Sequence, residues 1–401
     1  MIKFKVFQVI VISIFLFSFS LSTSRGIDLG ELSREERDHV LPINITSNSP
    51  EIEALAKRAF NAHGAYEIAN AKDSFFTLHL TQVTPTEVAL KINSDPSEKP
   101  QFEGQFQGKD LTEAILKACD AAVQKTSGLP GFFAGKIAFV GHRNKKNEIF
   151  TGDLFFKNVR QLTYDGVDVV FPKWSPDGKN IIYTSFYKTG FPDIFIMNAA
   201  TGEKKTVAAY TGTNIGGVFS PNGEKIAMIL SSSGNPELYT ANSNGHAIKR
   251  LTTTKSLEAA PSWSSDGKKI YFSCDTLGAP QIYVINADGE DMKRIPTNIS
   301  RYCDEPSANP LNPKKLAFTA ATSGTFQTAL FDFDAQESRF ITKGKIDHIE
   351  PCWTNDGRHL LLTRRNGTVS ELYLVDSQTG KETAIHSKEF GNASMASFVY
   401  P

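Results

Sequence analysis

The sequence lacks a net charge of either sign and contains few cysteines. Its 401 residues include 43 Lys and Arg and 43 Asp and Glu, so the formal net charge is zero. Balanced charge favours neither nucleic acid nor an anionic membrane surface as a partner, and we expect neither. The four cysteines form no C-x-x-C pair. They are interpreted as buried free thiols or as including one bridge between two of the last three, Cys274, Cys303 and Cys352.

Sequence motifs of common hydrolases and metal sites are also missing. There is no G-x-S-x-G nucleophile elbow and no H-E-x-x-H zinc motif, and the eight histidines are scattered along the chain. From these scattered positions we expect no convergent set of His, Asp and Glu residues. We therefore expect no catalytic residues, no metal and no cofactor, and we favour a binding protein over an enzyme.

The long apolar run of the sequence stands at its N-terminus. Residues 6–21 are apolar, follow Lys3 and Lys5, and precede small serine residues. This pattern predicts a cleaved secretory signal peptide over residues 1–24, with a retained anchor as the alternative. The run is short for a spanning helix, which needs about 20 apolar residues. We expect an exported protein whose mature form has no transmembrane segment.

A repeat of about 45 residues follows in the second part of the chain. Its third copy begins PSWSSDGKKIYFSC at Pro261, and equivalent positions in five copies are 45, 44, 45 and 45 residues apart. These equivalent positions are Trp174, Phe219, Trp263, Ala308 and Trp353. Each copy contains four short β-branched and aromatic runs separated by Gly, Asp, Asn and Pro. Four strands in a period of this size predict one blade of a β-propeller.

The two ends of the repeat region predict how the ring closes. Residues 136–163 supply three strands without a leading one, and Phe398 lies 45 residues after Trp353. The C-terminal segment is therefore expected to supply the first strand of the first blade. Closure by both ends removes exposed strand edges. We predict a six-bladed propeller over residues 129–401 in a monomeric protein.

Residues 25–128 have a different pattern. Two stretches have apolar residues at helical spacing, SPEIEALAKRAFNAHG and KDLTEAILKACDAAVQKTSG, and strand-like runs lie before and between them. This segment is expected to form a small α/β domain. The predicted fold is thus two-domain and mainly β, with an N-terminal α/β domain before a six-bladed propeller closed by the C-terminal strand.

The Asp-Gly step of the repeat has two interpretations, a reactive carboxylate or a turn. Asp177, Asn222, Asp266 and Asp356 occupy equivalent positions. All four precede a glycine, and the first three follow a Ser-Pro or Ser-Ser pair. Asp or Asn followed by Gly suits a tight hairpin. A catalytic residue is not needed once per blade, so we expect a structural role.

The loops before the first strand of each blade are better candidates for function. In a propeller they surround one mouth of the central channel, and here they differ from blade to blade: VDVVF, TNIGG, SLEAA, RYCDE and IDHIE. Variation on a repeating scaffold favours a binding face, with plain exposed loops as the alternative. The residues predicted to bind a partner are Phe171, Gly216, Glu258, Ala260, Asp304, Glu305, His348 and Glu350.

The sequence resembles TolB-type propeller proteins, the periplasmic components of Tol–Pal systems. The blade pattern P-x-W-S-P-D-G-K-x-I-x-[YF] and the domain order carry the resemblance, which covers nearly the whole chain. The segment TSGLPGFFAGKIAFV at Thr126–Val140 is similar to the junction between the two domains of that family.

The resemblance implies a non-enzymatic scaffold in the periplasm. Such proteins bind the peptidoglycan-associated lipoprotein Pal at the channel mouth and support outer-membrane integrity and cell division. The resemblance also implies contact between the mature N-terminus and a TolA-like protein, here through Arg25, Gly26, Ile27, Asp28 and Leu29. Two other classes stay open: a propeller hydrolase or lyase with a metal in the same mouth, and a peptidoglycan- or carbohydrate-binding module.

Overall fold

A computed structural model describes residues 40–94, 99–143, 145–386 and 388–400. The predicted signal peptide and the segment Arg25–Leu29 lie outside the described residues. Among the helices described, none is long and apolar enough to cross a membrane.

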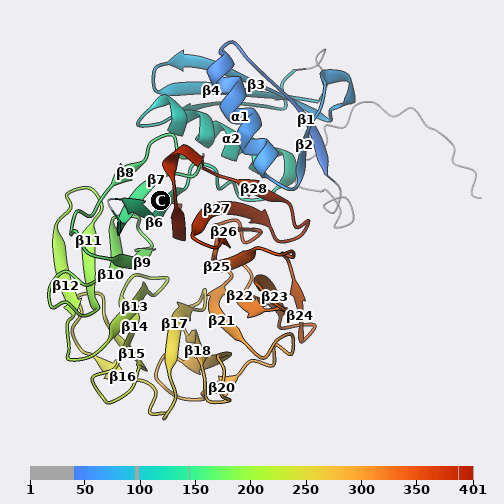
Figure 1. Ribbon diagram of the computed structural model, residues 1–401. Coiled ribbons are helices and arrows are strands. Elements are labelled where there is room, and N and C mark those ends of the chain that lie inside the picture. Colours follow the sequence, from blue (N-terminus) through green and yellow to red (C-terminus); the bar gives the residue numbers. More distant parts are fainter. Residues whose placement is uncertain (1–39, 95–98, 144, 387, 401) are drawn as a thin grey trace, which may run out of the picture.

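An α/β domain comes first along the chain and lies at one edge of the molecule (Figure 1). Its strands form one sheet in the order β2-β1-β3-β4-β5, in which β1 pairs in parallel with β2 and β3 and the remaining pairs are antiparallel. The elements are β1 (Leu41–Ser47), α1 (Pro50–Ala62), β2 (Tyr66–Ile68), a 3-10 helix (Ala71–Asp73), β3 (Phe76–Thr84), β4 (Glu87–Asn93), β5 (Phe102–Gln107) and α2 (Leu111–Ser127). The two helices pack against each other and against the sheet through their apolar faces.

Local signals account for the ends of these helices. Helix α1 begins with Pro50, whose missing N–H is not needed in the first turn. The Asp110 carboxylate caps α2 by accepting the N–H of Glu113 at 2.9 Å. Gly128 ends α2 with a φ of +71°, a conformation that favours glycine. The predicted domain boundary after residue 128 stays a prediction, because one apolar core continues from this domain into the propeller.

Six four-stranded antiparallel sheets follow within the described residues and form a ring (Figure 1). Blade 1 contains β29 (Ala393–Val399), β6 (Lys136–Arg143), β7 (Lys146–Asp153) and β8 (Arg160–Gln161). Blade 2 contains β9 (Val169–Trp174), β10 (Asn180–Ser185), β11 (Asp193–Asn198) and β12 (Lys204–Ala208). Blade 3 contains β13 (Asn214–Phe219), β14 (Lys225–Leu230), β15 (Glu237–Asn242) and β16 (Lys249–Arg250).

The other three blades repeat this order. Blade 4 contains β17 (Glu258–Trp263), β18 (Lys269–Cys274), β19 (Gln281–Asn286) and β20 (Lys293–Arg294). Blade 5 contains β21 (Cys303–Ala308), β22 (Lys315–Ala321), β23 (Phe326–Asp332) and β24 (Glu337–Phe340). Blade 6 contains β25 (Asp347–Trp353), β26 (His359–Asn366), β27 (Val369–Asp376) and β28 (Glu382–Ala384), and a 3-10 helix (Lys388–Phe390) leads to β29.

Strand β29 closes the ring as expected. It pairs antiparallel with β6, and Phe398 lies opposite Ile137, as Trp263 lies opposite Ile270 in blade 4. The six-bladed fold with a C-terminal closing strand is therefore confirmed. Because β29 is the last part of the chain and β6 comes early in it, the ring is held by a pairing of high sequence separation.

The aromatic position of the repeat lies between neighbouring blades. Trp263 is 6% exposed and its indole N–H donates to the backbone oxygen of Val218 in blade 3 at 3.2 Å. Trp353 does the same to Ser307 in blade 5 at 3.0 Å. A buried tryptophan removes roughly 150–250 Å² from water, so these side chains are main contributors to the cohesion of the blades.

The Asp-Gly step forms the turn between the first and second strands. Asp266 accepts hydrogen bonds from the hydroxyl of Ser264 at 2.6 Å and from the N–H of Lys268 at 3.1 Å, and Gly267 has a φ of +68°. The carboxylate thus organises its own hairpin, which confirms the structural interpretation. All four cysteines are free in the structure, in agreement with the interpretation as free thiols.

Candidate functional site

The propeller has two ends with different loops. We call the end that carries the loops before the first strands and between the second and third strands the channel face. We call the opposite end, with the Asp-Gly hairpins and the turns between the third and fourth strands, the turn face. Successive turns of an antiparallel meander alternate between the two ends, so each blade contributes two connections to each face.

A ring of six equivalent residues lines the channel. Each first strand contains one residue in the left-handed region: Phe171, Gly216, Ala260, Glu305, Glu350 and Met395, with φ of 55°, 72°, 50°, 55°, 59° and 55°. The pairing with the second strand shifts register at each of these positions, as at a β-bulge. All six residues border a central cavity of about 200 Å³. A non-glycine residue in this conformation costs about 1–3 kcal/mol and persists where the surrounding structure enforces it.

The two carboxylates in this ring join neighbouring blades. Glu305 accepts the hydroxyl of Thr319 at 2.6 Å and the N–H of Glu350 at 2.8 Å. Glu350 in turn accepts the hydroxyl of Thr363 at 2.5 Å and the N–H of Met395 at 2.9 Å. Burial, helped by the charge of Glu350, raises the pKa of Glu305 to about 7, and burial also raises the pKa of Glu350. These side chains therefore hold the ring of the channel together as well as lining it.

Six of the eight residues predicted to bind a partner border the channel. They are Phe171, Gly216, Ala260, Asp304, Glu305 and Glu350. The structure places Glu258 and His348 elsewhere, inside blades 4 and 6, where they are 1% and 3% exposed. Each lies two residues before the left-handed position of its strand, and the equivalent residues of all other blades are buried too, among them Cys303.

Neighbouring side chains form hydrogen bonds or close polar contacts with each of these two buried residues. Glu258 accepts the hydroxyls of Thr252 at 3.1 Å and Thr254 at 2.6 Å, and burial raises its pKa to about 7. His348 Nε2 lies 3.1 Å from a carboxylate oxygen of Glu382. Neither side chain is available to a molecule that approaches the channel face.

Exposed apolar side chains mark one sector of the channel face. They lie on the loops β8–β9, β10–β11, β12–β13, β16–β17 and β18–β19. We call this set the apolar crescent; its members and exposed fractions are Tyr164 75%, Tyr187 61%, Phe191 65%, Tyr210 46%, Leu257 54% and Leu277 64%. Single exposed apolar residues are ordinary, whereas a succession of them on one face marks an interaction surface. The sequence signal that could have found them is large apolar residues in positions where loops usually carry Gly, Asp or Ser.

Basic side chains mark the opposite sector of the channel face. Exposed basic residues stand on the loops and strand ends of blades 5 and 6 and of the adjoining part of blade 1: Arg301, Lys343, Lys345, Arg365, Lys145 and Lys146. Arg365 pairs with Asp347 at 3.0 Å. Among the described residues of this sector, Val369 at the start of β27 is a large apolar residue that is 51% exposed. We call this set the basic sector. The channel mouth therefore lies between a sector with exposed apolar side chains, which also carries the exposed Lys188 and Lys255, and a sector whose exposed side chains are mainly basic.

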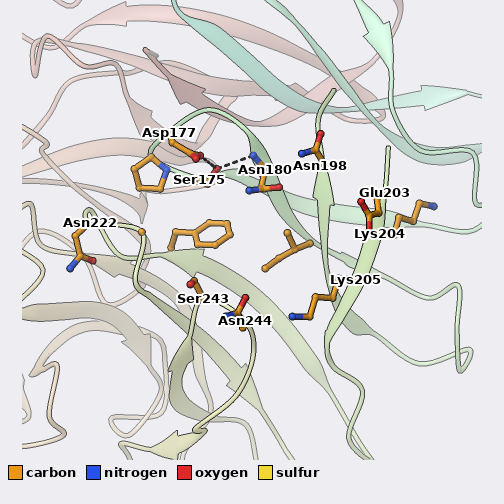
Figure 2. A pocket seen from close by; sticks show the side chains of 14 residues that line it. Ser175, Asp177, Asn180, Asn198, Glu203, Lys204, Lys205, Asn222, Ser243 and Asn244 are labelled. Atoms are coloured by element: carbon orange, nitrogen blue, oxygen red, sulfur yellow. Dashed lines mark hydrogen bonds between the residues drawn. The ribbon is translucent and has the colours of Figure 1, made fainter. Parts of the chain in front are cut away.

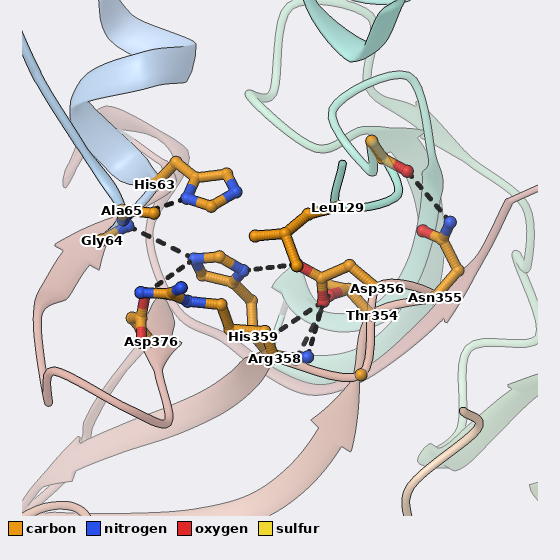
Figure 3. A network of polar contacts seen from close by, with 12 residues as sticks. His63, Gly64, Ala65, Leu129, Thr354, Asn355, Asp356, Arg358, His359 and Asp376 are labelled. Atoms are coloured by element: carbon orange, nitrogen blue, oxygen red, sulfur yellow. Dashed lines mark hydrogen bonds and ion pairs between the residues drawn. The ribbon is translucent and has the colours of Figure 1, made fainter. Parts of the chain in front are cut away.

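The turn face also carries two features that were considered as candidate sites. One is a pocket between blades 2 and 3 (Figure 2). The other is a buried polar network where the α/β domain meets blade 6 (Figure 3). In this network His359 Nδ1 donates to Asp356 at 2.6 Å, and Arg358 donates to Asp376 at 2.7 Å.

Opposite charges face each other within this network. Burial is the largest single influence on His359 and lowers its pKa, but the Asp356 and Asp376 carboxylates together outweigh burial, so the pKa of His359 is raised. His359, in return, holds the pKa of both carboxylates below their usual range despite their burial. Two carboxylates thus face the imidazole ring of His359 and the guanidinium of Arg358. The contact is tight, because a Cβ added to Gly64 of the α/β domain would lie 2.1 Å from an Asp376 oxygen.

His63 completes this network from the side of the α/β domain. His63, Asp356 and His359 each offer one metal-ligating atom within 4.8 Å of the others. However, Nδ1 of His63 accepts the N–H of Ala65 at 3.2 Å, and both nitrogens of His359 face carboxylates, at 2.6 Å and 3.3 Å. Three of the four ring nitrogens are therefore engaged, whereas Nε2 of His63 is buried without a hydrogen-bond partner among the described residues. The paired charges of Asp356, Arg358 and Asp376 make the cluster chiefly a structural ion network.

Comparisons with known proteins place the fold in a family. The family model described as the TolB beta propeller domain matches residues 123–398. A Tol-Pal system protein TolB of Desulfosudis oleivorans is 29% identical over 168 residues, which are 41% of this chain and 38% of that relative. One of Alcanivorax borkumensis is 34% identical over 131 residues, which are 32% of this chain and 30% of the relative. The alignments thus span less than half the length of these relatives.

A solved structure resembles the whole arrangement. The crystal structure of TolB from Acinetobacter baumannii is 21% identical, has a TM-score of 0.79, and covers 91% of this chain and 98% of that one. At this identity the likeness concerns the fold, and it includes the α/β domain as well as the propeller.

Proposed function

Because this chain belongs to the TolB β-propeller family, we propose that it is a non-enzymatic scaffold of a Tol-Pal-like system in the periplasm. The observation that carries the proposal is the channel face, where an apolar crescent and a basic sector flank the ring of left-handed residues. The carboxylates of the channel are hydrogen-bonded to the scaffold and hold it together. This arrangement suits the docking of a protein better than acid–base chemistry.

The proposed partner is a Pal-like peptidoglycan-associated lipoprotein that covers the channel mouth. A stable protein complex buries about 800 Å² on each partner, which is far more than the mouth itself offers. The loops that carry Tyr187, Phe191 and Leu257 extend the surface outward from the channel. Tyrosine and other aromatic residues supply much of the energy of protein interfaces.

The basic sector is expected to orient that partner. Its lysine and arginine side chains are exposed, so they steer an acidic surface toward the face rather than add much affinity. The proposal includes support for outer-membrane integrity and cell division. It also includes a TolA-like protein as a second partner, bound by residues 25–29, which precede the described part of the chain.

The test compares one exposed apolar pair with a matched control. Combined Tyr187→Ala and Phe191→Ala is expected to weaken binding of the purified Pal-like lipoprotein at least tenfold, because each truncated anchor residue costs about 1 kcal/mol or more. Leu311→Ala is the control, since Leu311 is 56% exposed but lies on the turn face, in the loop β21–β22. Binding is measured by calorimetry, and thermal unfolding checks that both variants are folded.

Two results would contradict the proposal. One is equal binding by the pair variant and the control. The other is a capture experiment on cross-linked envelopes in which the folded protein retrieves no peptidoglycan-associated lipoprotein.

A further inference from the structure

The connection between α1 and β2 lies directly on blade 6 (Figure 3). It consists of His63, Gly64 and Ala65, and we call it the clasp. The ring of His63 packs edge-on against the ring of His359, and the N–H of Gly64 lies 3.4 Å from Nε2 of His359. Through these contacts the clasp joins the α/β domain to the buried ionic network of blade 6.

The hydrogen bonds of His63 define which of its nitrogens carries the proton. Nδ1 accepts the N–H of Ala65 at 3.2 Å, so a neutral ring carries its proton on Nε2. Nε2 is buried and has no hydrogen-bond partner among the described residues. This tautomer leaves no free nitrogen lone pair for a metal ion, and a second proton on Nδ1 would face the N–H of Ala65, donor against donor. The closed clasp therefore accommodates only a neutral His63.

The carboxylates of blade 6 that face His63 are already paired. Asp356 and Asp376 lie against His359 and Arg358. Burial, and after it the neighbouring His359, holds the pKa of His63 well below its usual range, because the opposing influence of Asp356 is smaller. Protonation of His63 would add an unpaired charge to a buried interface, which is strongly unfavourable unless the interface opens.

The titratable groups of the α/β domain near His63 are engaged elsewhere. Tyr66 packs edge-on against the ring of His63, but its hydroxyl is hydrogen-bonded to Thr126 at 2.8 Å. Asp120 accepts backbone N–H groups of the segment that leads into the propeller, and Arg58 donates to backbone oxygens of the propeller. Among the described residues, none of these groups gives the ring of His63 a further acceptor.

We propose that the clasp is acid-sensitive: when His63 takes up a proton, residues 63–65 leave the turn face of blade 6 and loosen the α/β domain from the propeller. In the open position, water accepts the protons of both ring nitrogens. The carboxylates that face His359 belong to blade 6, so opening leaves these contacts in place and the response to acid depends on His63. The proposal is independent of partner docking, because the clasp lies away from the channel face.

The direction of the pH dependence follows from the protonation of His63. Because the pKa of His63 is lowered in the closed clasp, the clasp is most stable above the ordinary histidine pKa of about 6.5 and weakens as the pH falls below it. One proton that binds to the open form with this ordinary pKa raises the open population about fivefold between pH 6.5 and pH 5.5.

The test follows amide hydrogen exchange in the full chain by mass spectrometry at pH 6.5 and pH 5.5, with rates corrected for the intrinsic effect of pH on exchange. We expect exchange in residues 60–68 to rise about fivefold at pH 5.5, because these amides exchange from the open clasp. Strands β14 and β15 of blade 3 are the internal reference and should keep the same protection at both pH values, since a local opening leaves them paired.

Three variants separate titration from packing. His63→Asn retains a side-chain oxygen as acceptor for the N–H of Ala65 but cannot take up a proton, so the rise should disappear. His79→Asn is the matched control, because His79 is exposed on β3 of the same domain and should leave the rise unchanged. Gly64→Ala would place a methyl group against Asp376 and should open the clasp already at pH 6.5.

The proposal is overturned if the unaltered protein shows no rise at pH 5.5, or if His63→Asn retains the full rise. It is also overturned if blade 3 loses protection to the same extent as the clasp, since that would mean destabilisation of the whole protein. Thermal unfolding at pH 6.5 checks that the variants are folded, and His63→Gln replaces His63→Asn if that variant is not.

Discussion

The two faces of this propeller use the same strands in different ways. On the turn face the repeat is retained, and the Asp-Gly hairpin of blade 6 also serves as a docking surface for the α/β domain. Asp356 accepts the hydroxyl of Thr354 at 2.7 Å, as Asp266 does from Ser264, and additionally accepts the ring N–H of His359. On the channel face the loops diverge, and the apolar crescent is exposed.

The difference between the two faces indicates which parts of a repeat protein can change in sequence without loss of the fold. The hairpins on the turn face are short and organised by their own hydrogen bonds, so a change there disturbs the blade. The loops on the channel face contribute little to the cores between blades, and their side chains can follow the needs of a partner. Both faces nevertheless depend on one closed ring. Three experiments distinguish the stability that the whole ring provides from the contributions of the turn face and of the channel.

The largest effect is expected from deletion of residues 394–401. Strand β29 pairs with β6, and the Tyr400 hydroxyl donates to Asp120 of the α/β domain at 2.9 Å. Deletion leaves β6 as an open edge and removes Met395 and Ala396 from the channel lining. We expect an insoluble protein or a Tm lower by on the order of 10 °C, measured by calorimetry. An unchanged Tm would contradict closure of the ring by this strand.

A change in the buried network is expected to act on the turn face alone. Because the folded pKa of His359 is raised, its stabilisation is complete below its unfolded pKa of about 6.5 and is lost as the pH rises through the folded value. Burial lowers the pKa of His63, so the contribution of His63 is lost in the opposite direction, as the pH falls below about 6.5. His359→Gln should therefore lower stability by about 3–5 kcal/mol near pH 6.

The same variant should also flatten the decline of Tm between pH 6.5 and more alkaline pH while leaving the decline on the acid side. Unfolding curves over this range measure both effects, and partner binding at the channel face serves as the control. An identical pH profile in the unaltered protein and the variant would show that His359 is not charged in the folded protein.

The smallest effects are expected in the ring of the channel. Glu305→Gln keeps an acceptor for Thr319 and for the N–H of Glu350, and it removes a charge that is unfavourable there at pH values above the unfolded pKa. We expect a Tm equal to or slightly above that of the unaltered protein at pH 8. Glu305→Ala leaves the buried N–H of Glu350 without this acceptor and should cost about 1–3 kcal/mol. Equal Tm values for the two variants would mean that the carboxylate does not join blades 5 and 6.

Local patterns were sufficient to predict the blades. The period of 45 residues, the Asp-Gly turns and the register of Phe398 with the tryptophan positions are properties of short segments, and each strand repeats the same hydrogen bonding. The residues predicted for the channel follow in part from the same repeat. Phe171, Ala260 and Glu305 stand at equivalent positions of their blades and border one cavity. The placement of Glu258 and His348 inside their blades depends on which way the strand turns at the bulge, which the sequence of a loop does not reveal.

Sequence by itself determined the number of blades, their order and the way the chain closes on itself, because hydrophobic periodicity and turn chemistry act within a few residues. Tertiary structure alone decided which side chains meet. His63 and His359 are almost three hundred residues apart in the chain and pack with ring centroids 4.4 Å apart. The apolar crescent likewise gathers residues from several blades. Such contacts follow from the packing of whole blades and domains, and no local pattern encodes them.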